Sequence, residues 1–241
     1  MILTFKRLSL LTLVFLGMTA FHTVKADPIK LYTTGVNDAG ATLAAGAIDS
    51  HYSLIPGNSG GAGNSAQNVF VVGADNASPG VGWAANTTGS KWITTVTGGV
   101  FDAPTGNYTF RTTFTIDPTL GYDLSTASIS GTAFADDRFR IFINGVDVGV
   151  NLPNGGGSGW APGTLSSFLI SSGFQFGVNT IDFVVANTPV VPTPIGLQVT
   201  TLTGTILRGA TPPASVPEPT TLILIGTGLA GIAARARKKK A

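Results

Sequence analysis

The chain has 241 residues, no cysteine, 32 glycines and only 11% charged residues. This length fits one domain with two targeting ends, and the abundance of Thr, Ser, Asn and Val is typical of an all-β extracellular protein rather than a helical enzyme. The absence of cysteine excludes a disulfide framework and thiolate chemistry. Residues 27–215 carry eleven Asp and six basic residues, a net charge of −5, so the positive charge lies at the two ends and gives no nucleic-acid-binding signal.

Residues 1–26 are predicted to form a secretory signal peptide. Lys6 and Arg7 make a basic start, which is followed by an apolar stretch. Small or β-branched side chains stand one and three residues before the expected cleavage point, which lies between Ala26 and Asp27. The alternative is a signal anchor that stays attached.

Short alternating segments dominate residues 27–207. The clearest is 107–116, where apolar and polar side chains alternate with the period of two of a half-buried strand. The stretch before residue 68 is loop-rich with weak strand signals. The other expected strands are 68–72, 126–135, 138–143, 166–171, 180–187 and 196–207.

Turn signals separate these strands. Asn144-Gly145 predicts a two-residue hairpin, because both central positions need positive φ, and Val146, Val148 and Val150 continue the return strand. In 138–143, Phe139, Ile141 and Ile143 are expected to point inward. Regular short strands with Gly, Pro and Asn between them favour a β-sandwich over 27–207, followed by a Pro-rich linker over 208–215.

The last twenty-six residues, 216–241, have a distinct order of parts. Pro217 and Pro219 exclude a helix through them, and the uncharged run 220–234 then predicts a short transmembrane helix of roughly 22 Å. The basic tail, 235–241, fixes its orientation with the cations on the cytoplasmic side. These cations are Arg235, Arg237, Lys238, Lys239 and Lys240.

This order resembles the PEP-CTERM sorting signal, whose motif here is Val216, Pro217, Glu218 and Pro219. The resemblance implies recognition by an exosortase, a membrane-embedded cysteine peptidase of Gram-negative bacteria. It further implies a transient stay in the inner membrane, cleavage near the motif, and transfer of the preceding domain to the envelope or matrix. The alternative is a plain C-terminal anchor that is never processed.

The middle of the chain resembles the jelly-roll ectodomain common in PEP-CTERM proteins, which is similar to galactose-binding-like and carbohydrate-binding modules. The resemblance implies a jelly-roll β-sandwich over roughly residues 50–205. The segments that carry it are 91–93 (KWI), 108–114 (YTFRTTF), 135–138 (ADDR), 143–145 (ING), 177–183 (GVNTIDF) and 196–199 (GLQV).

No pattern predicts an enzyme. His51 is the one histidine of residues 27–215, and no nucleophile motif accompanies it. Glu218, the one glutamate, belongs to the sorting motif. A glycosidase needs two carboxylates at a fixed separation, whereas Asp136 and Asp137 are adjacent and on a strand would face opposite ways. A hydrolase that uses only aspartates is a remote alternative.

Two kinds of binding site are expected. Hard carboxylate oxygens suit a structural Ca²⁺ ion, for which Asp38, Asp49, Asp136 and Asp137 are candidates, although solvated turn aspartates are the favoured explanation. Sugar rings stack on exposed aromatic faces. Trp160, in a Gly/Pro loop, is the first candidate for stacking and Trp83 the second, whereas Trp92 is expected in the core.

The sequence therefore predicts an exported, non-enzymatic protein with a structural or adhesive role in the envelope or exopolysaccharide. The alternative is a carbohydrate-binding module with a defined glycan ligand. The expected partners are the exosortase, the inner membrane and exopolysaccharide, with no nucleic acid and no cofactor beyond the candidate calcium.

Overall fold

The computed structural model of the chain describes residues 26–56, 67–73, 82–97, 102–152, 159, 161, 163–188, 193–209, 227–228 and 235. Of the predicted signal peptide only Ala26 is among them, and the linker is described only at Arg208 and Gly209. The described part of residues 26–209 is all-β, as the composition and alternation predicted, apart from one 3-10 turn at Pro118–Leu120.

Thirteen strands are present among the described residues. In chain order they are β1 (Ala26–Ile29), β2 (Ile48–Ile55), β3 (Gln67–Val71), β4 (Ile93–Thr94), β5 (Asp102–Ala103), β6 (Gly106–Ile116), β7 (Tyr122–Asp136), β8 (Arg138–Ile143), β9 (Val146–Leu152), β10 (Ser166–Ile170), β11 (Gly177–Asn187), β12 (Thr193–Pro194) and β13 (Gly196–Arg208).

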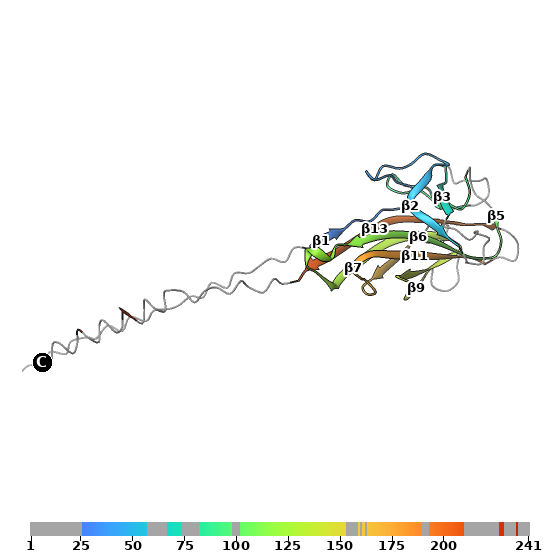
Figure 1. Cartoon of the computed structure of the whole chain (residues 1–241). Coiled ribbons are helices and arrows are strands. Elements are labelled where there is room, and N and C mark those ends of the chain that lie inside the picture. The colour runs from blue at the N-terminus through green and yellow to red at the C-terminus, as the bar shows by residue number, and fades with distance from the viewer. Residues whose placement is uncertain are drawn as a thin grey trace, which may run out of the picture.

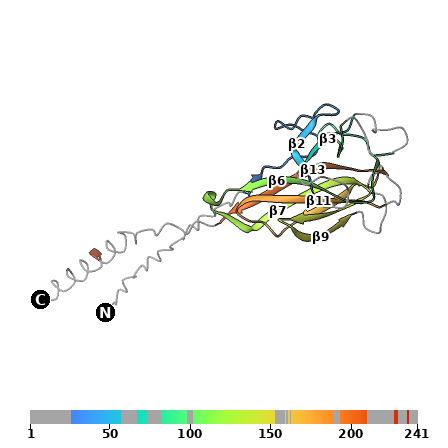
Figure 2. The same cartoon turned by 45° about the vertical axis from the view of Figure 1, so that its right-hand side comes forward.

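Eleven of the strands form one antiparallel sheet in the order β10-β7-β13-β4-β3-β2-β6-β11-β8-β9, with β1 added beside β13. The strands at the two ends of this order, β9 and β10, contact each other, so the sheet curls almost into a barrel. Two layers result, one around β7 and β13 and the other around β6 and β11 (Figures 1 and 2). The layers of the expected sandwich are thus two halves of one continuous sheet.

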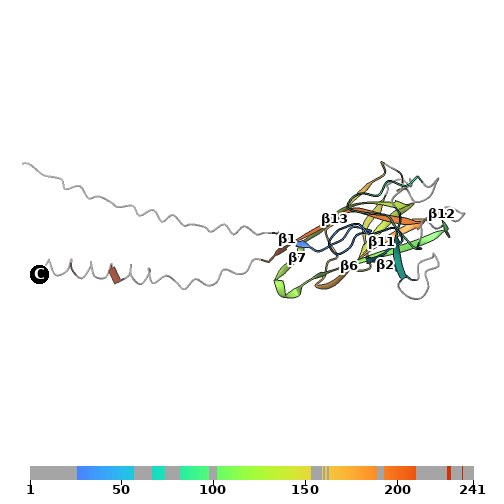
Figure 3. The same cartoon turned by 90° about the horizontal axis from the view of Figure 1, so that it is seen from above.

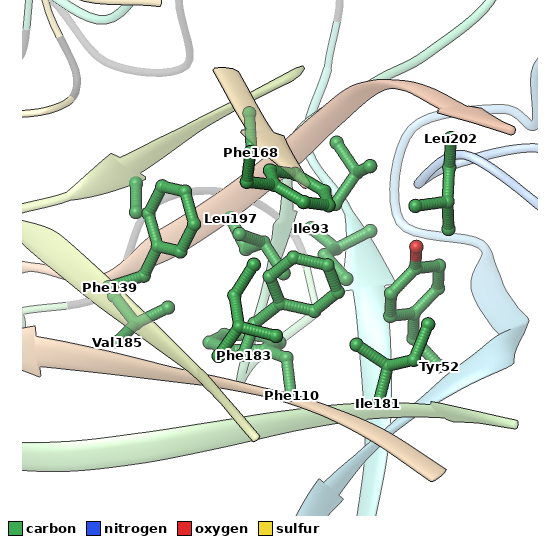
Figure 4. Close-up of a cluster of buried hydrophobic side chains, with 14 of the residues drawn as sticks. Tyr52, Ile93, Phe110, Phe139, Phe168, Ile181, Phe183, Val185, Leu197 and Leu202 are labelled. Carbon is green, nitrogen blue, oxygen red and sulfur yellow. The ribbon is translucent and has the colours of Figure 1, made fainter. Parts of the chain in front are cut away.

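Apolar side chains from both halves meet in the core between them. Phe168 of β10 packs against Phe183 of β11 and Phe139 of β8, with ring centroids 5.8 and 6.3 Å apart (Figure 4). Such edge-to-face contacts add to the stabilisation that burial of the rings gives. Gly131 of β7 allows this approach, because a Cβ there would lie 2.5 Å from the Phe168 ring.

The hairpin between β8 and β9 forms where the sequence predicted it. Asn144 and Gly145 have φ values of 49° and 81°, the left-handed conformation that this turn needs. The Asn144 side chain holds the turn to β11, since its Oδ1 accepts a hydrogen bond from Thr180 N–H and its Nδ2 donates to the Asn179 side chain. A local sequence signal and a tertiary contact therefore specify the same turn.

Several strands of the structure were not predicted or are longer than predicted. β2 lies in the stretch taken as loop-rich, because its inward position 49 carries an aspartate and a register shift interrupts its pairing with β3. β7 begins at Tyr122, four residues before the expected start, and β11 begins at Gly177, three residues before the expected start.

The pairing of β1 with β13 brings the two ends of the strand domain together. Ala26 lies opposite Leu207, so both ends leave from one pole, which we call the terminal pole. The small β5–β12 sheet lies at the opposite end, the distal pole (Figure 3). The two predicted targeting segments therefore attach to the same end of the domain.

Candidate functional site

A hollow lies on the outer face of β6, β11, β8 and β9, and we call it the β6–β8 groove. It encloses about 630 Å³. Its lining is mainly polar and basic. The lining residues are Ile55, Asn107, Thr109, Arg111, Arg138, Phe139, Arg140, Phe142, Gly145, Asn151, Asp182, Val184 and Ala186.

Strand register builds the groove. The inward residues of β6, β8 and β11 fill the core, so the alternate residues face outward. Small side chains on β11, Val184 and Ala186, stand between longer ones on the neighbouring strands, which leaves a hollow between them. Three rows cross the strands in register: Arg111, Asp182 and Phe142; Thr109, Val184 and Arg140; Asn107, Ala186 and Arg138.

The first row contains a two-pronged ion pair. Arg111 Nε and Nη2 donate to the two carboxylate oxygens of Asp182 at 2.6 and 2.7 Å. Asp182 is only 7% exposed, so this carboxylate depends on the guanidinium for its charge balance. The bond to Asp182 raises the pKa of Arg111 above its ordinary value, which keeps the guanidinium charged at any physiological pH.

The other two arginines are held less firmly. Arg140 forms an ion pair with Asp147 that is exposed on both sides, and its guanidinium lies 5.4 Å from the centroid of the Phe142 ring. The Arg138 side chain has no ion-pair or hydrogen-bond partner among the described residues. The groove therefore combines a fixed cation, an exchangeable one and one that is unpaired within the described structure.

Trp83 lies elsewhere, and the prediction that its face stacks on sugars is wrong. The ring is 1% exposed and stacks on Trp92, with centroids 4.3 Å apart. Its Nε1–H donates to Asp136 Oδ2 at 2.8 Å. A ring enclosed in this way has no face left for a ligand. Trp92 is buried, as expected, and Trp160 lies outside the described residues.

Asp136 ends β7 beside this tryptophan pair, and Asp137 follows the strand. Burial raises the pKa of Asp136 to about 8. The hydrogen bond from Trp83 lowers this pKa, whereas a hydrogen bond with Asp137 and the negative charge of Asp137 raise it further. The Asp137 carboxylate accepts hydrogen bonds from the backbone N–H and the hydroxyl of Thr188. Asp136 is thus a buried structural residue rather than the solvated turn residue that the sequence suggested.

The other two candidate calcium ligands surround His51, whose ring stacks on Tyr32. His51 Nδ1 lies 3.1 Å from the Val36 carbonyl oxygen and Nε2 lies 2.9 Å from Asp38 Oδ1. Asp49 is fully buried and accepts the backbone N–H groups of Gly35 and His51. Burial raises the pKa of Asp49, whereas the bond from His51 lowers that of Asp38.

The structure does not gather the four aspartates into one site. Two contact His51 and two lie at and directly after the end of β7, and no cluster of three or more potential metal ligands occurs among the described residues. No described nucleophile accompanies His51, because its two nitrogens already face the Val36 carbonyl and Asp38. The His51 cluster has the geometry of a bracing contact between β2 and the loop before it.

The sequence signal for the groove was present but incomplete. The alternation that placed Phe139 and Ile141 inward also placed Arg138, Arg140 and Phe142 outward. The missing information was the pairing of β8 and β6 with β11, because it alone brings Arg138 and Arg111 onto one surface.

The comparison with protein families concerns the C-terminal part of the sequence. Residues 215–238 match the PEP-CTERM protein-sorting motif. The motif implies an exported, membrane-anchored precursor that an exosortase processes. A search of curated proteins finds no match to this chain.

Most of the matched segment lies outside the described residues. This applies to Val216, Pro217, Glu218, Pro219, Arg237 and Lys238, and to all of the predicted span except Thr227 and Gly228. Lys239 and Lys240, which follow the matched segment, also lie outside the described residues. Thr227, Gly228 and Arg235 are helical and exposed. Within the described residues, no helix has the length and apolar character needed to cross a membrane.

Proposed function

We propose that the strand domain is a structural or adhesive component of the cell envelope or exopolysaccharide matrix, placed there through its C-terminal signal. The observation that carries the proposal is the sorting motif at residues 215–238, directly after a domain whose two ends meet at one pole. Its role there is binding rather than catalysis, and its fold is the jelly-roll type of β-sandwich.

Export needs two processing steps in this proposal. A signal peptidase cuts between Ala26 and Asp27, and the shortened β1 keeps Asp27, Pro28 and Ile29 paired with β13. Asp27 also accepts hydrogen bonds from Tyr122 and Arg208, which fix the new N-terminus to the domain. Residues 220–234 cross the inner membrane until the exosortase acts near Pro217.

Intact mass spectrometry of the protein from its native host, by cell fraction, tests this placement. We expect a protein that begins at Asp27, ends near Pro217 and is recovered from the surface or matrix fraction. A combined Pro217→Ala, Glu218→Ala and Pro219→Ala variant should retain the basic tail and stay in the membrane fraction. A wild-type protein that keeps its tail despite an active exosortase would contradict the proposal.

The role at the destination needs its own measurement. A strain without the gene should form a weaker matrix or attach less well to a surface, and the wild-type gene should restore both properties. The triple-alanine variant should not restore them, because its domain stays at the inner membrane. If that variant fully restored matrix strength and attachment, the role of the domain would not depend on its sorting, which would contradict the proposal.

A further inference from the structure

We propose that the β6–β8 groove binds a polysaccharide that carries carboxylate groups, of the kind that uronic acid residues provide. The inference rests on the proposed function in one respect, because export must deliver the domain to such a polymer. It names the chemistry of the partner, which the sorting motif leaves open.

The shape of the groove suits a chain rather than a single small molecule. Its three rows stand two residues apart along the strands, so the first and last rows are about 13 Å apart. Val184 and Ala186 form a low floor in the second and third rows, Asp182 ends this floor in the first row, and arginines flank it on β6 and β8. Several linked sugar rings can lie along the floor within reach of both flanks.

The charge of the groove points to an anion. Three of the six basic residues in 27–215, Arg111, Arg138 and Arg140, line this one hollow, although the segment as a whole has a net charge of −5. A guanidinium matches a carboxylate with two parallel hydrogen bonds. The groove is thus a local basic site on an acidic domain.

The three arginines have different parts in this site. Arg138 is half-buried and without a described partner, so it is available for a ligand carboxylate. The Arg140–Asp147 pair is exposed, and such pairs contribute little stability, so a ligand can replace Asp147. Arg111 uses Nε and Nη2 for Asp182, which leaves its Nη1 donors for a sugar oxygen.

The remaining lining fits the sugar part of the ligand. The side-chain amides of Asn107 and Asn151 both donate and accept, as hydroxyl groups require. The half-buried Phe142 ring offers an apolar surface beside them for a sugar C–H face. Carboxylate, hydroxyl and apolar contacts thus occur together in one groove.

Two other ligands are less well matched. A neutral glycan would place nothing opposite Arg138. A nucleic acid carries a continuous row of phosphates and binds best to an extended basic surface, whereas the net charge of this domain repels a dense polyanion. A carboxylated polysaccharide has fewer charges, spaced by neutral hydroxyl groups.

The test uses the full chain in mild detergent, titrated by calorimetry with hexamers of galacturonate, guluronate, mannuronate and glucuronate. EDTA is present, so that divalent cations do not bridge ligand and protein. We expect saturable binding to at least one of them, and binding at least about tenfold weaker to its methyl ester, which loses the charge but keeps the sugar. A DNA duplex of equal charge serves as the nucleic-acid probe.

Arg138→Gln should weaken this binding by about tenfold or more, because it removes a charge-assisted contact. Lys30→Gln is the matched control: it removes the same charge from the exposed segment after β1, outside the groove, and should bind like the wild type. Circular dichroism of both variants checks the fold. Any of four results would overturn the proposal: no hexamer binds, the methyl ester binds equally, DNA binds equally, or Arg138→Gln retains wild-type affinity.

The same variant separates this inference from the proposed function. Arg138→Gln should be cleaved at both ends in the host like the wild type, yet be released into the medium where the wild-type domain stays with the acidic matrix. Defective cleavage with intact uronate binding of the purified chain would count against the sorting proposal alone.

Discussion

Strands β6, β8 and β11 have an apolar face and a polar face, although residues of the two faces alternate along the same stretches of sequence. The inner face carries Phe110, Phe139 and Phe183, all 1% exposed or less, which pack in the core (Figure 4). The outer face carries Arg111, Arg138 and Asp182 along the groove. Neighbouring residues of one strand therefore differ in role: the inward side chain stabilises the sheet, and the outward side chain forms part of the groove surface.

This difference teaches that stability and recognition can be changed separately in this domain. An inner residue contacts side chains from the opposite half of the sheet, so its loss affects both layers. An outer residue contacts its row neighbours and solvent. Substitutions in the same strand should then differ in effect by several kcal/mol according to the face alone.

The largest effect is expected at the inner face. Phe183→Ala removes a fully buried ring that contacts Phe139 and Phe168, and should lower the free energy of unfolding by about 3–5 kcal/mol. Urea denaturation measures the change. A loss below about 1 kcal/mol would mean that the two halves of the sheet are not packed as described.

A buried carboxyl at the end of β7 should make stability depend on pH. The pKa of Asp136 is about 8 in the folded protein and 3.8 as the ordinary value, so the folded state holds a proton that the unfolded state has lost. Its contribution to stability is complete below about pH 4 and decreases as the pH rises toward 8, by about 2 kcal/mol between pH 6 and pH 8.

Asp136→Asn tests this dependence, because the amide mimics the protonated acid and its oxygen still accepts from Trp83. Thermal unfolding from pH 5 to pH 9 should show a steeper decline for the wild type than for the variant. Parallel curves for the two proteins would contradict the assignment of a buried, protonated Asp136.

The ion pair of the outer face should have an intermediate effect. Arg111→Ala leaves the nearly buried Asp182 carboxylate without its partner, which should cost about 1–2 kcal/mol because the pair is one-third open to solvent on the arginine side. In the double variant with Asp182→Asn, part of this loss should be recovered. Equal stability of the single and double variants would show that the pair is not coupled.

The smallest effect on stability is expected at Arg138, which has no described partner. Arg138→Gln should change the free energy of unfolding by less than about 0.5 kcal/mol. A loss above 1 kcal/mol in urea denaturation would mean that Arg138 supports the fold, and the contrast between the two faces would then fail at that position.

The features that were predicted best from the sequence are those that depend on residues close together in the chain. The inward positions of 138–143 and the turn at Asn144-Gly145 follow from alternation and from the φ values that this turn demands, and both are confirmed. The expected strand 126–135 was placed correctly but is longer, because pairing with β13 extends it to Tyr122.

The features that were not predicted from the sequence depend on contacts between residues far apart in the chain. Trp83 stands among Gly and Ala, which suggested an open loop, yet Gly196 and Phe134, both distant in sequence, enclose its cluster. β2 was not predicted because an aspartate, Asp49, stands at one of its buried positions. The hydrogen bonds that allow the burial of Asp49 come partly from Gly35, which is fourteen residues away in the sequence. The groove depends on the register of three strands, which no single strand encodes.

The antiparallel pairing of β13 with β7 and β1 has a mechanical consequence. β13 ends at the terminal pole, where the described strand domain has its C-terminal end, whereas the β6–β8 groove lies toward the distal pole. A pull between a polymer held in the groove and an attachment at the C-terminus would run along the strands. Because the ladder hydrogen bonds of β13 lie perpendicular to that direction, they would be loaded in shear and share the tension, and the domain would resist being torn from its anchorage.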